Sequence, residues 1–182
     1  MRPDHSVTLR APQPPDIEAR LALGYSAEVT RMFGGSARTD TEMTLEQASD
    51  WYRQLAEHPC GWIIEVDGVL AGEARLDNIN RQDQRARMAM GLFSDRSLGR
   101  GIGRVAVRLV LDQAFGEMRL HRVDLRVLSF NDRAIRCYRA CGFRHEGTER
   151  ESAFIDGVRH DDWIMSILRP EYEALGNQAA LR

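Results

Sequence analysis

Three alternating glycines, Gly99, Gly101 and Gly103, stand between a strand pattern that ends near Phe93 and a helical pattern that begins near Ile102. Apolar residues after the turn follow the i, i+3, i+4, i+7, i+8 spacing of one helix face: Ile102, Val105, Ala106, Leu109 and Val110. A strand that continues through a tight turn into an amphipathic helix is typical of folds in which helices cover a sheet. The order of patterns along the whole chain, two helices, a run of antiparallel strands and then alternating strands and helices, predicts a mixed α/β sheet.

The remaining patterns supply strands and helices that fit such a sheet. Asp67-Gly68 and Asp156-Gly157 each favour a tight hairpin turn, and the TLEQ sequence from Thr44 matches a helix capping box. We expect strands at residues 7–10, 61–66, 69–76, 85–93, 123–127, 144–154 and 158–168. We expect helical structure from Pro15 to about Phe33, from Thr44 through Leu55, from Ile102, and from Asn131 to a cap at Gly142.

Composition limits the partners and the compartment. The chain has 182 residues without an evident repeat or linker, which fits a single domain over residues 1–182. A net charge of −2 gives no basic excess for nucleic acid, and no apolar run approaches a membrane span. Three cysteines, Cys60, Cys137 and Cys141, form neither a CxxC pair nor an even framework, so we expect no metal, a reducing compartment and a cytoplasmic protein.

The glycine turn has the chemistry of an anion site. Backbone N–H groups approach a pyrophosphate closely where Cβ atoms are absent, and the positive end of a helix dipole adds attraction. Arg100 and Arg104 could donate to phosphate oxygens as well. The turn could also be a simple connection. It lacks the Lys-Ser/Thr of a Walker loop, and a dinucleotide fingerprint would need the first strand of a βαβ unit, although Asp124 is near the required spacing.

The sequence NDRAIRCYRACGF, residues 131–143, resembles the NxxAxxxYxxxGF signature of GNAT acetyltransferases. The resemblance covers about residues 69–168, its motif-bearing core, and FIDGVRHD at 154–161 is similar to the branch that acetylates ribosomal-protein N-termini. It implies a GNAT-like α/β (α+β) fold: a mixed, mostly antiparallel twisted sheet of six to seven strands flanked by about four helices.

The resemblance also implies how acetyl-CoA binds. The glycine turn would hold the pyrophosphate, the preceding strand the pantetheine arm, and the 131–143 helix would flank the thioester. The implied backbone contacts come from Leu92, Phe93, Ser94, Gly99, Arg100, Gly101, Ile102, Gly103 and Arg104. The implied helix contacts come from Asn131, Arg133, Ala134, Cys137 and Tyr138. Leu98 stands where the family prefers Gln or Arg, which weakens a side-chain role there but leaves the backbone cradle intact.

Acetyl transfer needs a neutral amine, donors for an oxyanion and a proton for the thiolate. A backbone N–H near Leu92 or Phe93, freed by a bulge at Gly91, could polarise the thioester carbonyl. Tyr138 could donate the proton, or it could be an ordinary aromatic on the apolar helix face; Asn131 could equally be a plain N-cap.

The base is less defined by the sequence. Glu73 is the catalytic candidate, with Asp77, His160 and Asp161 as alternatives, whereas His121 and His145 are interpreted as structural or surface residues. A missing obvious base favours a weakly basic acceptor such as an α-amino group.

The predicted function is transfer of an acetyl group from acetyl-CoA to a primary amine by direct attack in a ternary complex. The acceptor is a protein N-terminal α-amine or a small-molecule amine, and a homodimer is possible. The alternatives are an acyl-CoA-binding sensor without turnover and a dinucleotide-binding domain.

Overall fold

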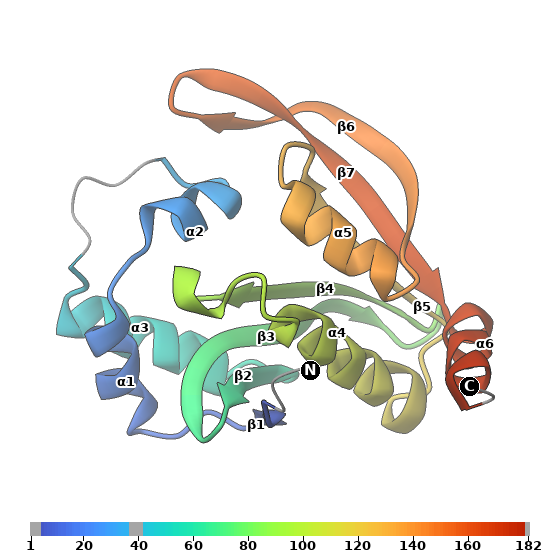
Figure 1. Ribbon diagram of the computed structural model, residues 1–182, viewed down its shortest axis with the longest axis horizontal. Coiled ribbons are helices and arrows are strands. Elements are labelled where there is room, and N and C mark those ends of the chain that lie inside the picture. Colours follow the sequence, from blue (N-terminus) through green and yellow to red (C-terminus); the bar gives the residue numbers. More distant parts are fainter. Residues whose placement is uncertain (1–4, 37–41, 181–182) are drawn as a thin grey trace.

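A computed structural model describes residues 5–36 and 42–180, with side chains through residue 176. Within these residues, seven strands form one sheet in the order β1-β2-β3-β4-β5-β7-β6 (Figure 1). The strands are β1 (Val7–Arg10), β2 (Gly61–Val66), β3 (Val69–Asn80), β4 (Arg85–Leu92), β5 (Arg122–Leu128), β6 (Arg144–Ile155) and β7 (Val158–Leu168). β4 and β5 run parallel, and the other neighbouring pairs are antiparallel. The predicted fold class is confirmed.

Helices cover both faces of this sheet. In the described part of the chain the α-helices are α1 (Asp16–Leu23), α2 (Ala27–Met32), α3 (Leu45–Ala56), α4 (Ile102–Asp112), α5 (Asp132–Ala140) and α6 (Arg169–Ala180), and η1 (Asp95–Ser97) and η2 (Gln113–Glu117) are short helices before and after α4. Ile63 and Ile64 are adjacent in β2 and are both fully buried, because their side chains point to opposite faces. Ile64 belongs to the main core with Ile102 of α4, whereas Ile63 packs with Leu55 of α3.

Three local predictions are confirmed in detail. Asp67 and Gly68 have φ values of 51° and 81°, as the tight β2–β3 turn requires. Asp156 and Gly157 repeat this geometry, with 50° and 79°, between β6 and β7. The side chain of Thr44 accepts from the Gln47 amide and the Gln47 side chain accepts from the Thr44 amide, which completes the capping box of α3.

Other boundaries differ from the prediction. The helical segment expected from residue 15 to 33 is divided into α1 and α2, because Gly24 leaves the helix with φ 61° and Ser26 starts a new one by accepting from the Val29 amide. β3 continues to Asn80, beyond the expected end at Leu76. α6 was not expected from the sequence. The Tyr172 hydroxyl of α6 donates to Asp112 Oδ1 of α4 at 2.9 Å, a contact between residues far apart in the sequence. None of the described helices is long and apolar enough to cross a membrane.

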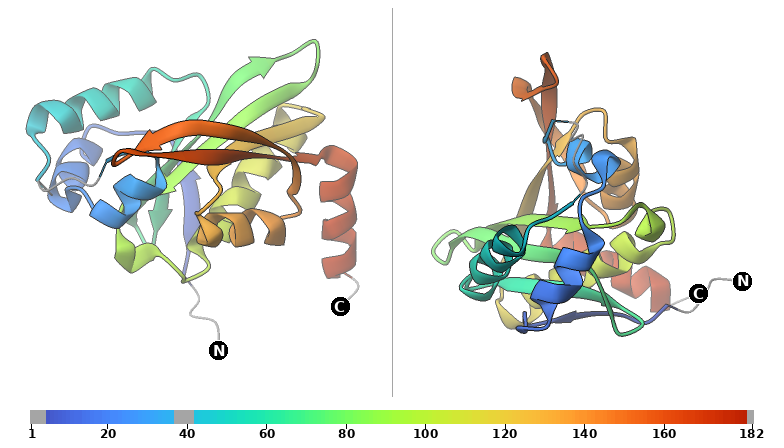
Figure 2. Two further views of the ribbon diagram at one scale, coloured as in Figure 1. Left: turned by 90° about the horizontal axis from the view of Figure 1, so that it is seen from above. Right: turned by 90° about the vertical axis from the view of Figure 1, so that its left-hand side faces the viewer.

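The sheet opens between its two parallel strands. β4 pairs with β5 only from Arg85 opposite Arg122 to Arg87 opposite Asp124. Beyond that point β4 continues along β3 to Leu92, while β5 continues along β7 to Leu128. The two strands therefore diverge toward their carboxyl ends. On the other side of β5, the long β6–β7 hairpin projects from the rest of the sheet (Figure 2).

Candidate active site

A cavity of about 710 Å³ occupies the divergence between β4 and β5. It extends from the glycine turn before α4 to the point where the two strands meet. Its walls come from α2, β4, the glycine turn, β5, α5 and β7. The lining includes Met32, Phe33, Asp77, Arg87, Met88, Ala89, Met90, Gly91, Leu92, Leu98, Gly99, Gly101, Gly103, Arg104, Arg126, Asn131, Arg133, Ala134, Arg136, Cys137, Tyr138 and Asp162. An open sheet with helix N-termini directed at the opening is a common place for a ligand.

The glycine turn presents backbone to this cavity. Gly99 and Gly101 have φ values of 73° and 83°, in the left-handed region, and nothing lies within 4 Å of the position a Cβ would take at either. Among the described residues, no backbone or side-chain acceptor is bonded to the amides from Gly99 to Gly103. Free amides at the start of α4, with open space in front of them, fit the diphosphate of coenzyme A. A Cβ at Gly103 would lie 3.6 Å from Cys137 Sγ, an ordinary van der Waals distance, so α5 packs directly against this turn.

The edge of β4 supplies a second set of amides. The Phe93 amide donates to the Ala71 carbonyl, and the register with β3 is unbroken from Leu92 to Arg87. Alternate amides of a strand point to opposite neighbours, so those of Leu92 and Met90 face the opening toward β5.

Two expectations about β4 are corrected by this register. The sheet has no bulge at Gly91, and the Phe93 amide is already bonded. The free amides arise from divergence of the parallel strands instead. Neither Phe93 nor Ser94 lines the cavity.

Arginines surround the glycine end of the cavity. Arg104, Arg133 and Arg136 line it, and Arg133 also donates to Glu28 of α2 at 2.6 Å. Arg100 points elsewhere, because its guanidinium contacts His5 at 2.5 Å. The Ile102 side chain is buried in the main core, so only its backbone is available to a ligand. Positive charge at this end suits the phosphates.

Helix α5 brings its predicted residues to the cavity wall. Asn131 caps the helix by accepting from the Ala134 amide at 3.1 Å, and its side-chain nitrogen donates to the Met32 carbonyl at 3.4 Å. Ala134, Cys137 and Tyr138 line the cavity from the same face. Burial raises the pKa of Tyr138, with Cys137 and Cys141 adding to the effect, so the phenol keeps its proton at neutral pH. A hydrogen bond with Cys141, and burial, raise the pKa of Cys137 as well.

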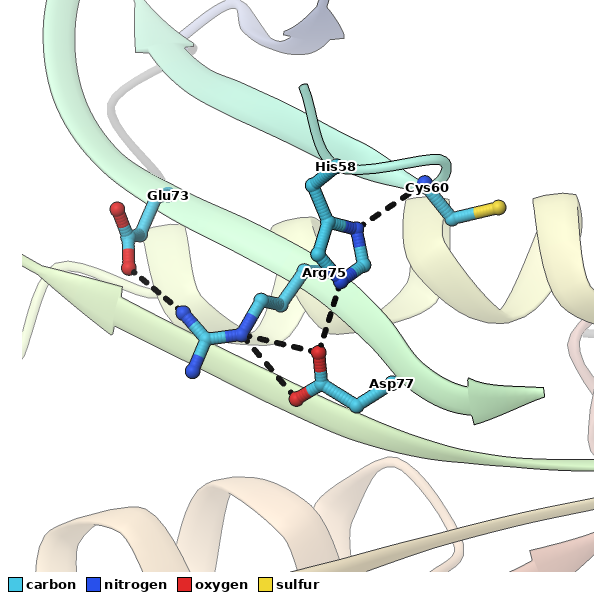
Figure 3. Close-up of polar contacts among 5 residues, drawn as sticks. All are labelled: His58, Cys60, Glu73, Arg75 and Asp77. Carbon is cyan, nitrogen blue, oxygen red and sulfur yellow. Dashed lines mark hydrogen bonds and ion pairs between the residues drawn. The ribbon is translucent and has the colours of Figure 1, made fainter. Parts of the chain in front are cut away.

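The proposed base, Glu73, lies outside the cavity lining. Its carboxylate accepts from Trp51 Nε1 and, at 3.3 Å, from Arg75 Nη1. Asp77, four residues beyond Glu73 on β3, does line the cavity. Figure 3 shows Asp77 in contact with Arg75 and His58. The His160 ring packs edge-to-face against Phe130 with 4.7 Å between ring centroids, and neither it nor Asp161 lines the cavity. Of the four candidates, only Asp77 reaches the space where an acceptor could bind.

Several lining residues were not identified from the sequence. Arg136 follows Arg133 by three residues, so helical periodicity could have identified it. Met88 and Met90 could have been inferred from strand alternation with Leu92. Phe33 had no such signal; it lies over Gly91 because α2 folds across the sheet. In the described part of the chain, no three His, Cys, Asp or Glu side chains gather as metal ligands would.

A glycine cradle for a diphosphate, free strand amides beside it and a protonated tyrosine in the opening between parallel strands define an acetyl-CoA-dependent acyltransferase. The sequence matches the acetyltransferase (GNAT) domain family over residues 6–144, and the chain belongs to that family. Acetyl-CoA is the co-substrate, and the open glycine turn fits it.

Named relatives agree with this assignment. The chain is 40% identical to Probable N-acetyltransferase YjcK of Bacillus subtilis over 118 residues, which span 64% of this chain and 65% of the relative. It is 28% identical to the spermidine N(1)-acetyltransferase of Escherichia coli K12 over 172 residues, 93% of this chain and 90% of the relative. The fold resembles that of the Vibrio cholerae spermidine N-acetyltransferase, crystallised with CoA and spermine, with a TM-score of 0.76. That similarity covers 92% of this chain and 98% of the other, at 24% identity.

Proposed function

We propose that this protein transfers the acetyl group of acetyl-CoA to a primary amine that enters the cavity from the side of Asp77 and α2. The observation that carries the proposal is the single continuous cavity, which is lined at one end by the free glycine-turn backbone and further along by Tyr138. The acceptor class proposed is a protein N-terminal α-amine or a small-molecule amine such as the spermidine named for relatives.

The residues have distinct roles in this proposal. The amides from Gly99 to Gly103, with Arg104 and Arg136, bind the diphosphate. The outward amides of Leu92 and Met90 orient the pantetheine arm and lie beside the thioester, where they can stabilise an oxyanion. Tyr138 donates its proton to the leaving thiolate and recovers one from the new amide nitrogen. The amine attacks directly, because both substrates share one cavity.

The proposal is tested by following thiol release with spermidine, an aminoglycoside and a peptide that has a free N-terminal alanine. We expect release with at least one amine. Tight acetyl-CoA binding without release from any of them would contradict turnover and favour an acyl-CoA sensor. NAD serves as the control ligand: coenzyme A should raise the melting temperature and NAD should not.

The placement of the diphosphate is tested by Gly101→Asp. An aspartate would put a Cβ and a negative charge beside the phosphates, at a residue with φ 83°. We expect coenzyme A binding to be lost in calorimetry, while circular dichroism shows a folded protein. Unchanged affinity would refute the assignment of the turn to the diphosphate.

The organisation of the whole chain stays a prediction. We propose that residues 1–182 form one acetyltransferase domain, and that the protein is a homodimer. Light scattering after size-exclusion chromatography measures the mass in solution, and a mass of one chain would contradict the dimer.

A further inference from the structure

The charged side chains differ between the two ends of the cavity. Arg104 and Arg136 line the end near the glycine turn. The end where β3, β4, β5 and β7 meet is lined by Asp77, Asp162, Arg87 and Arg126, and the side chains paired with them outside the lining are Arg75, Asp124 and Glu149. The two carboxylates and two guanidiniums of this lining balance in charge, so a cationic group would be held there by an individual carboxylate and not by a net negative charge.

Most of these charges are occupied by one another. Arg87 donates to Asp124 at 2.6 Å, and Arg126 bonds Asp162 and lies 3.1 Å from Glu149. Asp162 also accepts from Ser152 at 3.0 Å. Glu73, held by Trp51 and Arg75, is outside the cavity. Of the two lining carboxylates at this end, Asp162 is bonded to Arg126, which also lines the cavity. Asp77 is bonded instead to Arg75 and His58, which do not line it.

Two residues hold the Asp77 carboxylate (Figure 3). Arg75 Nε lies 3.1 Å from each carboxylate oxygen, and His58 Nε2 lies 3.0 Å from Oδ1. The Cys60 amide donates to His58 Nδ1 at 3.1 Å, so Nδ1 is the acceptor nitrogen and the proton is on Nε2. This hydrogen-bonding chain fixes the His58 tautomer that donates to Asp77.

Asp77 lies between two cavities. It lines the large cavity, and with His58, Leu76 and Ile79 it also lines a second, smaller one of about 550 Å³. His58 reaches the carboxylate from the side of the second cavity. One side of Asp77 is thus supported by the protein, and its other side is available to a ligand in the large cavity.

We propose that Asp77 binds the acceptor nitrogen of the proposed acetyl transfer and selects cationic amines, with His58 as the positioning residue behind it. The inference rests on the function proposed above. Arg75 and His58 hold the Asp77 carboxylate in place and leave its cavity side to a ligand. The carboxylate holds the ammonium group and, after the ammonium has lost a proton to water, directs the amine toward the thioester.

Asp77→Asn keeps the shape and removes the charge. We expect the KM for the amine to rise by about 10- to 100-fold, the range of a lost charged hydrogen bond, with unchanged coenzyme A binding in calorimetry. The probes are spermidine, kanamycin and an N-terminal alanine peptide, each assayed by thiol release wherever the wild-type protein turns it over. Asp83→Asn, on the exposed β3–β4 turn, is the matched control and should behave as the wild type.

His58 is tested by a pair of substitutions. His58→Gln retains a donor for Asp77 and should stay near the wild-type KM, whereas His58→Ala should raise the KM of the amine several-fold. If His58 acts only through Asp77, the double variant His58→Ala/Asp77→Asn is no worse than Asp77→Asn alone. Additive effects would overturn the positioning role.

The remaining outcomes separate this inference from the proposed function. If Asp77→Asn has the KM for the amine of the wild-type protein, the assignment to Asp77 is wrong. The same holds if the KM for the amine rises in Glu73→Gln instead. Either result would leave the transferase function unaffected. Loss of coenzyme A binding in Asp77→Asn would overturn it too, because a structural role would then explain the effect. Absence of thiol release by the wild-type protein with all three probes would refute the function and the inference together.

Discussion

Tyr138 shows how one residue can serve the core and the chemistry at once. Its ring is partly buried against the main core and lies 5.8 Å from the Phe143 ring, centroid to centroid. The same side chain lines the cavity, where burial raises its pKa. Burial would also desolvate a neighbouring thiolate and raise its proton affinity, so transfer from the phenol to sulfur stays feasible.

Tyr138→Phe retains the ring and removes the proton. We expect kcat to fall by about 100-fold or more, the typical contribution of a general acid, because the thiolate would leave without a donor. Calorimetry should show coenzyme A binding close to that of the wild-type protein. Equal turnover would remove Tyr138 from the reaction.

Asn131 illustrates a residue for which two roles were open. The structure confirms the cap, since its side-chain oxygen accepts from the Ala134 amide. Its nitrogen extends to the Met32 carbonyl of α2, a contact between residues far apart in the sequence. Contact with the pantetheine arm stays a prediction.

At the scale of elements, two glycines in β3 and β4 lie where the surrounding atoms leave no room for a Cβ. A Cβ at Gly72 would lie 2.1 Å from the Gly91 carbonyl oxygen, which is backbone in the neighbouring strand. A Cβ at Gly91 would lie 1.8 Å from Phe33 Cζ, the far end of a side chain that is 59% exposed. The first clash can be relieved only by moving a strand, whereas the second needs one ring to turn.

Gly72→Ala should therefore destabilise the fold. We expect the free energy of unfolding in urea to fall by about 2–3 kcal/mol, the upper part of the range for overpacking, and the melting temperature to fall with it.

Gly91→Ala is the paired substitution on the neighbouring strand. It should lower the free energy of unfolding by less than about 1 kcal/mol, because Phe33 can move. It should change the KM of the amine instead, since Phe33 lines the cavity. Equal destabilisation by the two variants would contradict this reading of the β3–β4 contact.

At the scale of the molecule, ion pairs connect strands across the sheet. Arg122 of β5 donates to both carboxylate oxygens of Glu146 in β6, at 2.8 and 2.5 Å, and to Ser166 Oγ of β7 between them. These bonds, together with the Ser166 hydroxyl and the charge of Arg122, lower the pKa of Glu146 from 4.5 to about 2. The network links β5, β7 and β6, the half of the sheet on one side of the cavity.

This pKa makes part of the stability depend on pH. Between pH 4.5 and about 2 the unfolded chain binds more protons than the folded one at Glu146, so folding stability rises with pH there. The contribution is complete above that interval and is lost as the pH falls through about 2.

We expect wild-type protein to melt higher than Glu146→Gln at neutral pH, and the difference to shrink as the pH is lowered through this interval. Melting curves from pH 7 to 2 measure it. Glu117→Gln, at an exposed residue after α4, is the control. A difference that stays constant with pH would contradict the ionic origin.

Local interactions explain what the sequence alone determined. Capping at Thr44, the Asp-Gly turns and the spacing of apolar residues in α4 depend on neighbours within a few residues, so each could be predicted before the structure. The glycine turn and the 131–143 signature predicted the family in the same way, because the residues that form them are close in the sequence.

Tertiary structure decided the opening between β4 and β5, the exclusion of Glu73 and the position of Asp77. Glu73 and Asp77 lie on the same face of the same strand, and alternation cannot distinguish them. Trp51 of α3 donates a hydrogen bond to Glu73. The loop after α3 places His58 beside Asp77 at the edge of the cavity. The difference arises from contacts between residues 19 or 22 positions apart, which chain folding brings together and local sequence patterns do not encode.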